Sequence, residues 1–297
     1  MDDLVSVVIT TYGRTDTLRR AIQSVLNQTH QNMEILVVDD NKETDLKAKV
    51  RELVEGIKDA RLKLIVNEVN VGGAVARNVG IANSKADYIA FLDDDDEYLP
   101  IKIEKQLELF KNSSDKVGLI YGYCLSIDSQ GHEVKYTYDY TGKCVFEGML
   151  DCIAATSQWM CRKEALDSVG CFSDVPCKQD STVIVKLLAA GYEVDRVPEF
   201  LSIYHDEESQ RISRQGHEKR IIGEEKLRDL CRSHYDLLSE RERKEVEYRF
   251  ACRLAPHYYA TKDFVHFKSA LKNILTTHLF KRTSLSFYKQ FIRYMVK

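Results

Sequence analysis

The stretch Tyr88-Ile89-Ala90-Phe91-Leu92-Asp93-Asp94-Asp95-Asp96-Glu97 joins an apolar, strand-like segment directly to five acidic residues. An acidic helix start before Pro100 would explain the last two acids, because a helix dipole favours negative charge there. It leaves the other three unexplained. Carboxylates crowded at a strand end must be protonated, solvated or neutralised by a cation. An oxygen-rich site open to water and phosphate suits Mg²⁺ or Mn²⁺, so the run is a candidate metal site.

Strand-like and helix-like segments alternate on both sides of this run. Apolar strands are expected at 5–10, 35–38, 62–66, 88–92 and 119–123, with helical periodicity at 18–26, 46–57, 74–82 and 101–110. The alternation predicts an α/β fold with a Rossmann-like, doubly wound, mostly parallel sheet. In such sheets, ligands bind beyond the carboxyl ends of the strands.

Polar residues also follow two other expected strands. Thr10-Thr11-Tyr12 ends the first strand, and Asp39-Asp40-Asn41 ends the second. An Asp at this edge can accept a base N–H, and a Tyr can stack on a base. Taken alone, Asp-Asp-Asn is more typical of a turn.

After residue 123 the pattern changes. Tyr136, Tyr138 and Tyr140 alternate as on a half-buried strand, a helix is expected at 179–190, and strands are expected near 193–197 and 201–204. From about residue 215 the chain is helical and highly charged. We therefore expect one domain over residues 1–212 and a helical C-terminal region over 213–297.

Composition excludes several classes of protein. The 297 residues include 43 Lys+Arg and 46 Asp+Glu, giving a net charge of −3, and 44% are hydrophobic. This balance excludes a disordered or collagenous chain. An acidic N-terminus and the lack of a long apolar run predict a cytoplasmic protein without a secretory signal or membrane span. The eight cysteines include no C-x-x-C pair, so we expect reduced, small core residues.

The C-terminal 34 residues are basic. Residues 264–297 carry seven Lys or Arg and no acid, and the segment 279–297 interleaves them with aromatic and apolar residues. This pattern suits an interfacial helix on an anionic membrane, placing the protein peripherally on the inner face of the plasma membrane. A helix that docks its apolar face on the protein is an equal alternative. No nucleic acid is expected as a partner, because no binding motif accompanies the charge.

Five ordered segments carry a resemblance to a known family. They lie at residues 5–12, 24–29, 34–40, 70–80 and 91–96. Together they are similar to the successive signatures of the family 2 glycosyltransferases of the bacterial polysaccharide type, which have the GT-A fold. The resemblance covers residues 4 to about 205. It implies a cytosolic, metal-dependent, inverting enzyme that moves one sugar from a nucleotide-diphosphate sugar, commonly a UDP-sugar. The acceptor would be a saccharide or a lipid-linked saccharide in cell-surface glycan synthesis.

The resemblance also implies roles for individual residues. Thr10, Tyr12 and Asp40 would hold the nucleotide base, and Arg77 would lie near the nucleotide or its diphosphate. Within the acidic run the register is ambiguous. We favour Asp95 as the ligand of Mn²⁺ or Mg²⁺, with Asp93 or Asp94 on ribose or sugar hydroxyls.

The general base of the family comes from a later pair of residues that opens a helix, which here is Gln179-Asp180. Inverting displacement needs a carboxylate that takes the proton of the acceptor hydroxyl. The alternative is that Asp180 merely caps the helix. His205 follows a strand and is a further candidate ligand of the metal or diphosphate, although a structural role is the alternative.

Two rival functions remain open. A sugar nucleotidyltransferase shares the alternation and the metal dependence, but residues 10–15 contain one glycine instead of a glycine-rich phosphate loop. A non-catalytic module of the same fold that binds nucleotide and metal would use the same acids. Turnover separates such a module from an enzyme.

Overall fold

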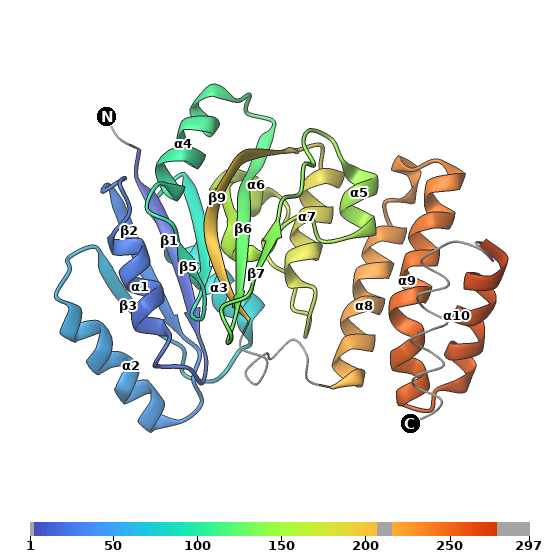
Figure 1. Ribbon diagram of the computed structural model, residues 1–297, viewed down its shortest axis with the longest axis horizontal. Coiled ribbons are helices and arrows are strands. Elements are labelled where there is room, and N and C mark those ends of the chain that lie inside the picture. The colour runs from blue at the N-terminus through green and yellow to red at the C-terminus, as the bar shows by residue number, and fades with distance from the viewer. Residues whose placement is uncertain (1–2, 207–215, 278–297) are drawn as a thin grey trace. The chain divides into compact units, whose positions relative to one another are not determined.

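The computed structural model describes residues 3–206 and 216–277. Nine strands form one sheet in this part of the chain. They are β1 (Val5–Thr11), β2 (Met33–Asp39), β3 (Leu62–Val66), β4 (Tyr88–Asp93), β5 (Glu97–Tyr98), β6 (Val117–Asp128), β7 (Glu133–Tyr136), β8 (Trp159–Arg162) and β9 (Glu193–Asp206). The strand order is β3-β2-β1-β4-β8-β6-β9-β5, and β7 pairs with β6 (Figure 1).

The N-terminal half of this sheet is parallel. β1 pairs with β2 and β4, and β2 pairs with β3, all in the parallel direction. Beyond β4 the sheet is mixed, because β8 runs antiparallel to both β4 and β6. The predicted α/β architecture is therefore confirmed, with antiparallel strands added after the parallel part. The two strands expected between 193 and 204 are one continuous strand, β9.

Helices cover both faces of the parallel part, as the alternation predicts. They are α1 (Leu18–Leu26), α2 (Thr44–Ile57), α3 (Gly73–Asn83) and α4 (Lys102–Asn112). Val5, Val7 and Ile9 of β1 share one apolar core with residues of α1, α2 and α4. Val8 points to the opposite face, since neighbouring residues of a strand alternate, and packs against Gly80 of α3.

The described residues fall into two compact units, each of which we describe by itself. The first consists of 3–144, 153–174 and 186–206. Besides the sheet it contains the short helices η1 (Thr156–Gln158) and α6 (Lys163–Ser168). The second consists of 145–152, 175–185 and 216–277. The helix α7 (Gln179–Ala189) contributes residues to both units.

The second unit is helical, which confirms the expected C-terminal helices. Its helices are α5 (Val145–Leu150), the start of α7, α8 (His217–Arg232), η3 (Tyr235–Leu237), α9 (Glu240–Ala260) and α10 (Phe264–Thr277). Ser239 and Glu242 form a reciprocal capping box at the start of α9. Leu227, Phe250 and Leu254 belong to the apolar core of this unit.

Four further expectations from the sequence concern the domain boundary, the basic C-terminal segment, membrane-spanning helices and the cysteines. The domain boundary expected at 212/213 and the basic segment 279–297 lie outside the described residues. Among the helices that the structure describes, none is both long and apolar enough to cross a bilayer. The eight cysteines are free, and four of them are buried.

Two helical glycines provide a test of this packing. A Cβ at Gly80 would lie 2.3 Å from Cγ1 of the buried Val8, whereas a Cβ at Gly56 of α2 would meet nothing within 4 Å. We expect Gly80→Ala to lower the free energy of unfolding by about 1–3 kcal/mol, as other overpacked cores do. Gly56→Ala should raise it by about 0.5–1 kcal/mol, because alanine favours the helix. Urea denaturation of both variants measures the two changes. Equal effects of the two substitutions would contradict the described packing of α3 on β1.

Candidate active site

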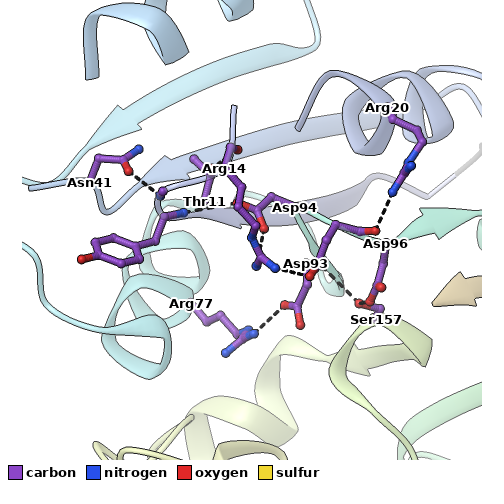
Figure 2. A network of polar contacts seen from close by, with 12 residues as sticks. Thr11, Arg14, Arg20, Asn41, Arg77, Asp93, Asp94, Asp96 and Ser157 are labelled. Atoms are coloured by element: carbon purple, nitrogen blue, oxygen red, sulfur yellow. Dashed lines mark hydrogen bonds and ion pairs between the residues drawn. The ribbon is translucent and has the colours of Figure 1, made fainter. Parts of the chain in front are cut away.

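The carboxyl ends of β1, β2 and β4 meet at one edge of the sheet. The register places Thr11 beside Asp39 and Thr10 beside Asp93. The three polar segments that the sequence predicts at strand ends therefore come together in one place (Figure 2). This is the edge at which open α/β sheets bind ligands.

The four aspartates after β4 do not share one environment. The chain forms a turn here, with a hydrogen bond of 3.1 Å from Asp96 N to Asp93 O. Exposed and buried side chains alternate along this turn. The side chains of Asp93 and Asp95 are 35% and 25% exposed, whereas Asp94 is 1% exposed and Asp96 is 2% exposed. Asp93 and Asp95 are therefore the pair of carboxylates that solvent reaches.

Three arginines from other segments neutralise the run. Arg14 Nη2 lies 2.6 Å from Asp94 Oδ1, and its Nη1 contacts Asp95 Oδ2. Arg77 of α3 pairs with Asp93 at 2.5 Å. Arg20 of α1 donates to the carbonyl oxygen of Asp95 at 2.9 Å (Figure 2).

The charges and the burial shift the protonation of these groups. Burial raises the pKa of Asp94 to about 7, although the Arg14 guanidinium opposes the shift. Burial also raises the pKa of Asp95, again against Arg14. Burial by itself would lower the pKa of Arg14, but the surrounding aspartates raise it. Arg14 therefore stays charged, and its charge holds Asp94 and Asp95 together.

Asp96 contacts the short helix η1 through Ser157. Its Oδ2 accepts a hydrogen bond from Ser157 Oγ of η1 at 2.5 Å, and the same Oγ accepts from Asp93 N at 3.1 Å. Burial, aided by the charges of Asp95 and Asp93, raises the pKa of Asp96 well above its usual range. Through these hydrogen bonds with Ser157, Asp96 and the backbone of Asp93 link η1 to the end of β4.

The loop after β1 carries the residues expected to contact a base. Tyr12 is 41% exposed, and its backbone N–H donates to Asp94 Oδ2 at 3.3 Å. The next residue, Gly13, has φ of 73° and donates its N–H to Asn41 Oδ1 at 2.6 Å. The Tyr12 ring is accessible for stacking, and Thr10 is half-buried at the strand end.

Asp40 holds a neighbouring loop. Its Oδ1 accepts from Asn67 Nδ2 and Val71 N, each at 2.9 Å. Its Oδ2 accepts from Asn70 Nδ2 at 2.8 Å and from Gly72 N at 2.9 Å. A carboxylate has about four acceptor positions, so these four donors use the whole capacity of Asp40. Its role in binding a base stays a prediction, and a base N–H would have to replace one of these donors.

His205 lies against Glu97, with Nε2 2.6 Å from Oε1. Among residues 3–206 and 216–277, no three Asp, Glu, His or Cys side chains are grouped closely enough to hold a metal by themselves. A Mg²⁺-type ion, however, is commonly held by one or two carboxylates together with substrate phosphates. The half-exposed Asp93 and Asp95 fit that donor set, so Asp95 is a suitable protein ligand. The metal role of His205 stays a prediction.

Asp180 belongs to the second unit. It lies inside the first turn of α7, half-buried, and its Oδ1 accepts from Ser181 N at 2.7 Å. The thiol of Cys152 donates to its Oδ2 at 3.3 Å. Burial raises the pKa of Cys152 well above its usual range, so this thiol keeps its proton. α7 begins at Gln179, so Asp180 is its second residue, and its carboxylate accepts a hydrogen bond from a backbone N–H of the first turn.

An ion triad centred on the buried Glu224 includes Lys178, which lies near Asp180 in the chain. Lys178 Nζ is 3.3 Å from Glu224 Oε1, and Arg253 Nε is 2.9 Å from Glu224 Oε2. Arg253 also donates to the carbonyl oxygen of Leu150 at 2.6 Å. The triad ties the segment that precedes α7 to α8 and α9, and so fixes the start of the helix that carries Asp180.

Sequence analysis missed four residues of the first unit, namely Arg14, Arg20, Asn41 and Ser157. Each acts through a contact with a residue far away in the sequence; Arg14 and Asp95 are 81 positions apart. One signal was present in the sequence. A run of four aspartates needs cations, and Arg14 is the cation nearest to the polar end of β1. Trp159 is fully buried and stacks on Phe172, so it fills core.

Comparison with solved structures identifies the class of fold. S. aureus TarS residues 1–349, solved in complex with UDP-GlcNAc, matches with a TM-score of 0.62 at 12% identity, over 90% of each chain. The mannosyltransferase PcManGT of Pyrobaculum calidifontis, solved with GDP-Man and Mn²⁺, matches with a TM-score of 0.61 at 15% identity, over 98% of this chain and 84% of that one. The fold is therefore that of the GT-A glycosyltransferases.

The sequence identifies the family. The sequence model of Glycosyl transferase family 2 matches residues 6–170, which is more than half of the chain. The protein belongs to this family, as the five ordered segments indicate.

Two relatives illustrate the range of similarity within the family. An uncharacterized glycosyltransferase of Methanocaldococcus jannaschii is 30% identical over 68% of this chain and 70% of its own. The UDP-Glc:alpha-D-GlcNAc-diphosphoundecaprenol beta-1,3-glucosyltransferase WfgD of Escherichia coli is 37% identical over 41% of this chain. The match spans about half of the latter's length, 46%.

The neighbouring Asp39 and Asp40 provide a matched test of the loop arrangement. In Asp40→Asn an amide donor would face N–H donors whichever way the side chain turns, so we expect a loss of about 2 kcal/mol or more of unfolding free energy. Asp39 Oδ1 accepts only from Asn41, and its buried Oδ2 has no hydrogen-bond partner among the described residues. Asp39→Asn should therefore cost about 1 kcal/mol or less. Urea denaturation, with hydrogen exchange of residues 67–72, measures both effects; a larger loss for Asp39→Asn would contradict this account.

Proposed function

We propose that this protein is a metal-dependent, inverting glycosyltransferase that moves one sugar from a nucleotide-diphosphate sugar to a saccharide or lipid-linked saccharide. One observation carries the proposal. A member of glycosyl transferase family 2 presents two half-exposed carboxylates, Asp93 and Asp95, at the carboxyl end of β4. The exposed Tyr12 and the cation Arg77 lie at the same sheet edge.

The donor is a UDP-sugar in this proposal. Thr10, Tyr12 and Asp40 are assigned to the base, with the exposed Tyr12 ring as the stacking surface. Arg77 serves the nucleotide or its diphosphate, and Asp93 or Asp94 serves ribose or sugar hydroxyls. The E. coli relative named for UDP-Glc supports a uridine donor and makes UDP-Glc the first one to try.

Asp95 is the protein ligand of Mn²⁺ or Mg²⁺, and the tentative second ligand is His205. The ion, when bound, would neutralise the charge that develops on the leaving diphosphate. This chain's own contribution is to hold the Asp95 carboxylate at the surface. The turn that begins at Asp93 does this.

Asp180 is the general base. An acceptor hydroxyl attacks the anomeric carbon from the side opposite the diphosphate, and Asp180 takes its proton as the new C–O bond forms and the bond to the diphosphate breaks. The half-buried carboxylate already accepts three hydrogen bonds, one from Cys152 and two from Ser181, which fix its orientation.

Donor turnover tests the proposal. With Mn²⁺, the wild type should release nucleoside diphosphate from one sugar of a panel that begins with UDP-Glc, and chelation should stop the release. Asp95→Asn should lower kcat by about 100-fold or more, since a metal contributes several kcal/mol to transition-state stability. With GlcNAc-diphospho-lipid as the first acceptor to try, Asp180→Asn should lower transfer by about 10²–10⁴-fold, the usual contribution of a general base.

The control for this experiment is Asp167→Asn. Asp167 is a half-exposed acid on α6 that pairs with Lys163, so its loss should leave turnover unchanged. Donor binding without turnover of any sugar or acceptor would favour the non-catalytic module. Formation of a nucleotide sugar from a sugar phosphate would favour the nucleotidyltransferase.

The proposed acceptor determines where in the cell the enzyme has to work. A lipid-linked acceptor lies at a membrane, and the basic segment 279–297 would bring the enzyme to the anionic inner face of the plasma membrane. Each basic residue near such a surface contributes about 1 kcal/mol of attraction. The E. coli relative, named for a diphosphoundecaprenol acceptor, supports a lipid-linked substrate here.

Vesicle flotation tests the membrane proposal. The full chain should float with phosphatidylglycerol-containing vesicles and much less with neutral phosphatidylcholine vesicles, and added salt should weaken the association. Deletion of residues 279–297 should abolish flotation while donor turnover in solution persists. If the deletion leaves flotation unchanged, the segment is not a membrane anchor.

A further inference from the structure

Arg14 occupies the carboxylates that the proposed function assigns to the donor and its metal. Its two terminal nitrogens contact Asp94 Oδ1 and Asp95 Oδ2, so one guanidinium bridges neighbouring acids (Figure 2). The Arg14 side chain is 19% exposed. A planar guanidinium with two donor atoms on two carboxylates is among the stronger ion pairs, particularly where solvent is mostly excluded.

The contact on Asp95 has a direct consequence. The Oδ2 atom that receives Arg14 Nη1 belongs to the carboxylate with the best case as metal ligand. A divalent cation bound to this carboxylate would lie close to the guanidinium, and the two positive charges would repel each other. Two cations, one internal and one from solution, therefore compete for the same carboxylate.

We infer that Arg14 is an internal counter-cation of the aspartate run, which competes with a divalent metal for Asp95 and leaves this carboxylate when the metal binds. The inference rests on the proposed function, because that function assigns Asp95 to the metal. The bridging guanidinium offsets the repulsion between Asp94 and Asp95 when no metal is bound. The apparent dissociation constant of the metal is then the intrinsic one divided by the fraction of molecules in which Arg14 has left the carboxylate.

The other two arginines do not have this position. Arg20 donates to the backbone carbonyl of Asp95 and pairs with Glu97 at 3.2 Å, so it does not lie on the Asp95 carboxylate. Arg77 pairs with Asp93, which is a separate carboxylate. Removal of Arg20 takes away the same charge from the same neighbourhood without freeing the proposed ligand atom. Arg20→Met is therefore the matched control.

Binding of Mn²⁺ alone, followed by the loss of the aqueous Mn²⁺ signal in electron paramagnetic resonance, tests the inference without nucleotide. If Arg14 holds the carboxylate in nine of ten molecules, Arg14→Met should bind Mn²⁺ about tenfold more tightly than the wild type. Arg20→Met should change the affinity by about threefold or less, because a nearby charge acts only through screened attraction. Arg14→Lys should fall between Arg14→Met and the wild type, since an ammonium cannot bridge two carboxylates as a guanidinium does.

Thermal unfolding gives a second measurement. In chelator, Arg14→Met should melt below the wild type, because Asp94 and Asp95 lose their shared cation. Mn²⁺ should raise the melting temperature of Arg14→Met more than that of the wild type. If Arg14→Met does not fold in chelator, Arg14→Lys provides the comparison.

Two outcomes would overturn the inference. One is Mn²⁺ affinity in Arg14→Met that equals or falls below that of the wild type, and the other is equal tightening in Arg14→Met and Arg20→Met. Neither measurement involves donor or acceptor. If the wild type turns over a donor and Arg14→Met shows no tightening, the inference alone fails. If Arg14→Met binds Mn²⁺ more tightly and no donor reacts, the proposed function alone fails.

Discussion

Four consecutive carboxylates at the end of β4 repel one another, and the rest of the site depends on how the protein offsets that repulsion. Burial and cations do so together. Asp94 and Asp96 are withdrawn from solvent, and burial raises the pKa of both carboxyl groups. Arg14 and Arg77 carry the opposite charge to the run. Since these arginines come from the segment after β1 and from α3, charge neutralisation also fixes the relative positions of several βα segments.

Hydrogen bonds to backbone groups complete this arrangement. Asp40 binds the loop that precedes α3, Asn41 binds the loop after β1, and Ser157 joins η1 to the end of β4. Hydrogen bonds that involve a charged group each contribute about 1.5–3 kcal/mol, roughly twice the contribution of neutral ones. These hydrogen bonds to buried acceptors therefore hold the three segments in place. Half-exposed groups such as Tyr12 lie on the solvent side of them.

The sequence predicts the elements of this framework well, because periodicity is a local property. The strand expected at 62–66 has the observed bounds, and the other strands of the parallel part differ by two residues or fewer at each end. Local patterns fail where tertiary contacts decide. Tyr138 and Tyr140 continue the alternation of Tyr136, yet β7 ends at Tyr136. The interval between 197 and 201 suggested a break, but β9 continues through it with a register shift: Gly122 of β6 pairs with Val197, and the next residue, Tyr123, pairs with Phe200.

Local patterns do not reveal tertiary contacts, and this limit also decides which parts of the site the sequence predicts. Strand-end positions follow from alternation, so Thr10, Asp40 and Asp93 could be placed at one edge in advance. The partners of these residues could not. Arg14 meets Asp95 across 81 positions, and Ser157 meets Asp96 across 61. Apart from the position of Arg14 just after the first strand, a single sequence does not reveal such pairings, because many of the 43 basic residues could have supplied the charge.

The turn at the end of β4 gives the four aspartates of the proposed metal site different environments. Alternating burial divides the acids into an inner pair, Asp94 and Asp96, and an outer pair, Asp93 and Asp95. The inner pair has raised pKa values and bonds to Arg14, Tyr12 and Ser157, which suits a structural role. The outer pair is two residues apart and faces solvent. This geometry favours the register Asp93-x-Asp95 over any other in the run, and it does so through backbone conformation, which the sequence of four identical residues could not reveal.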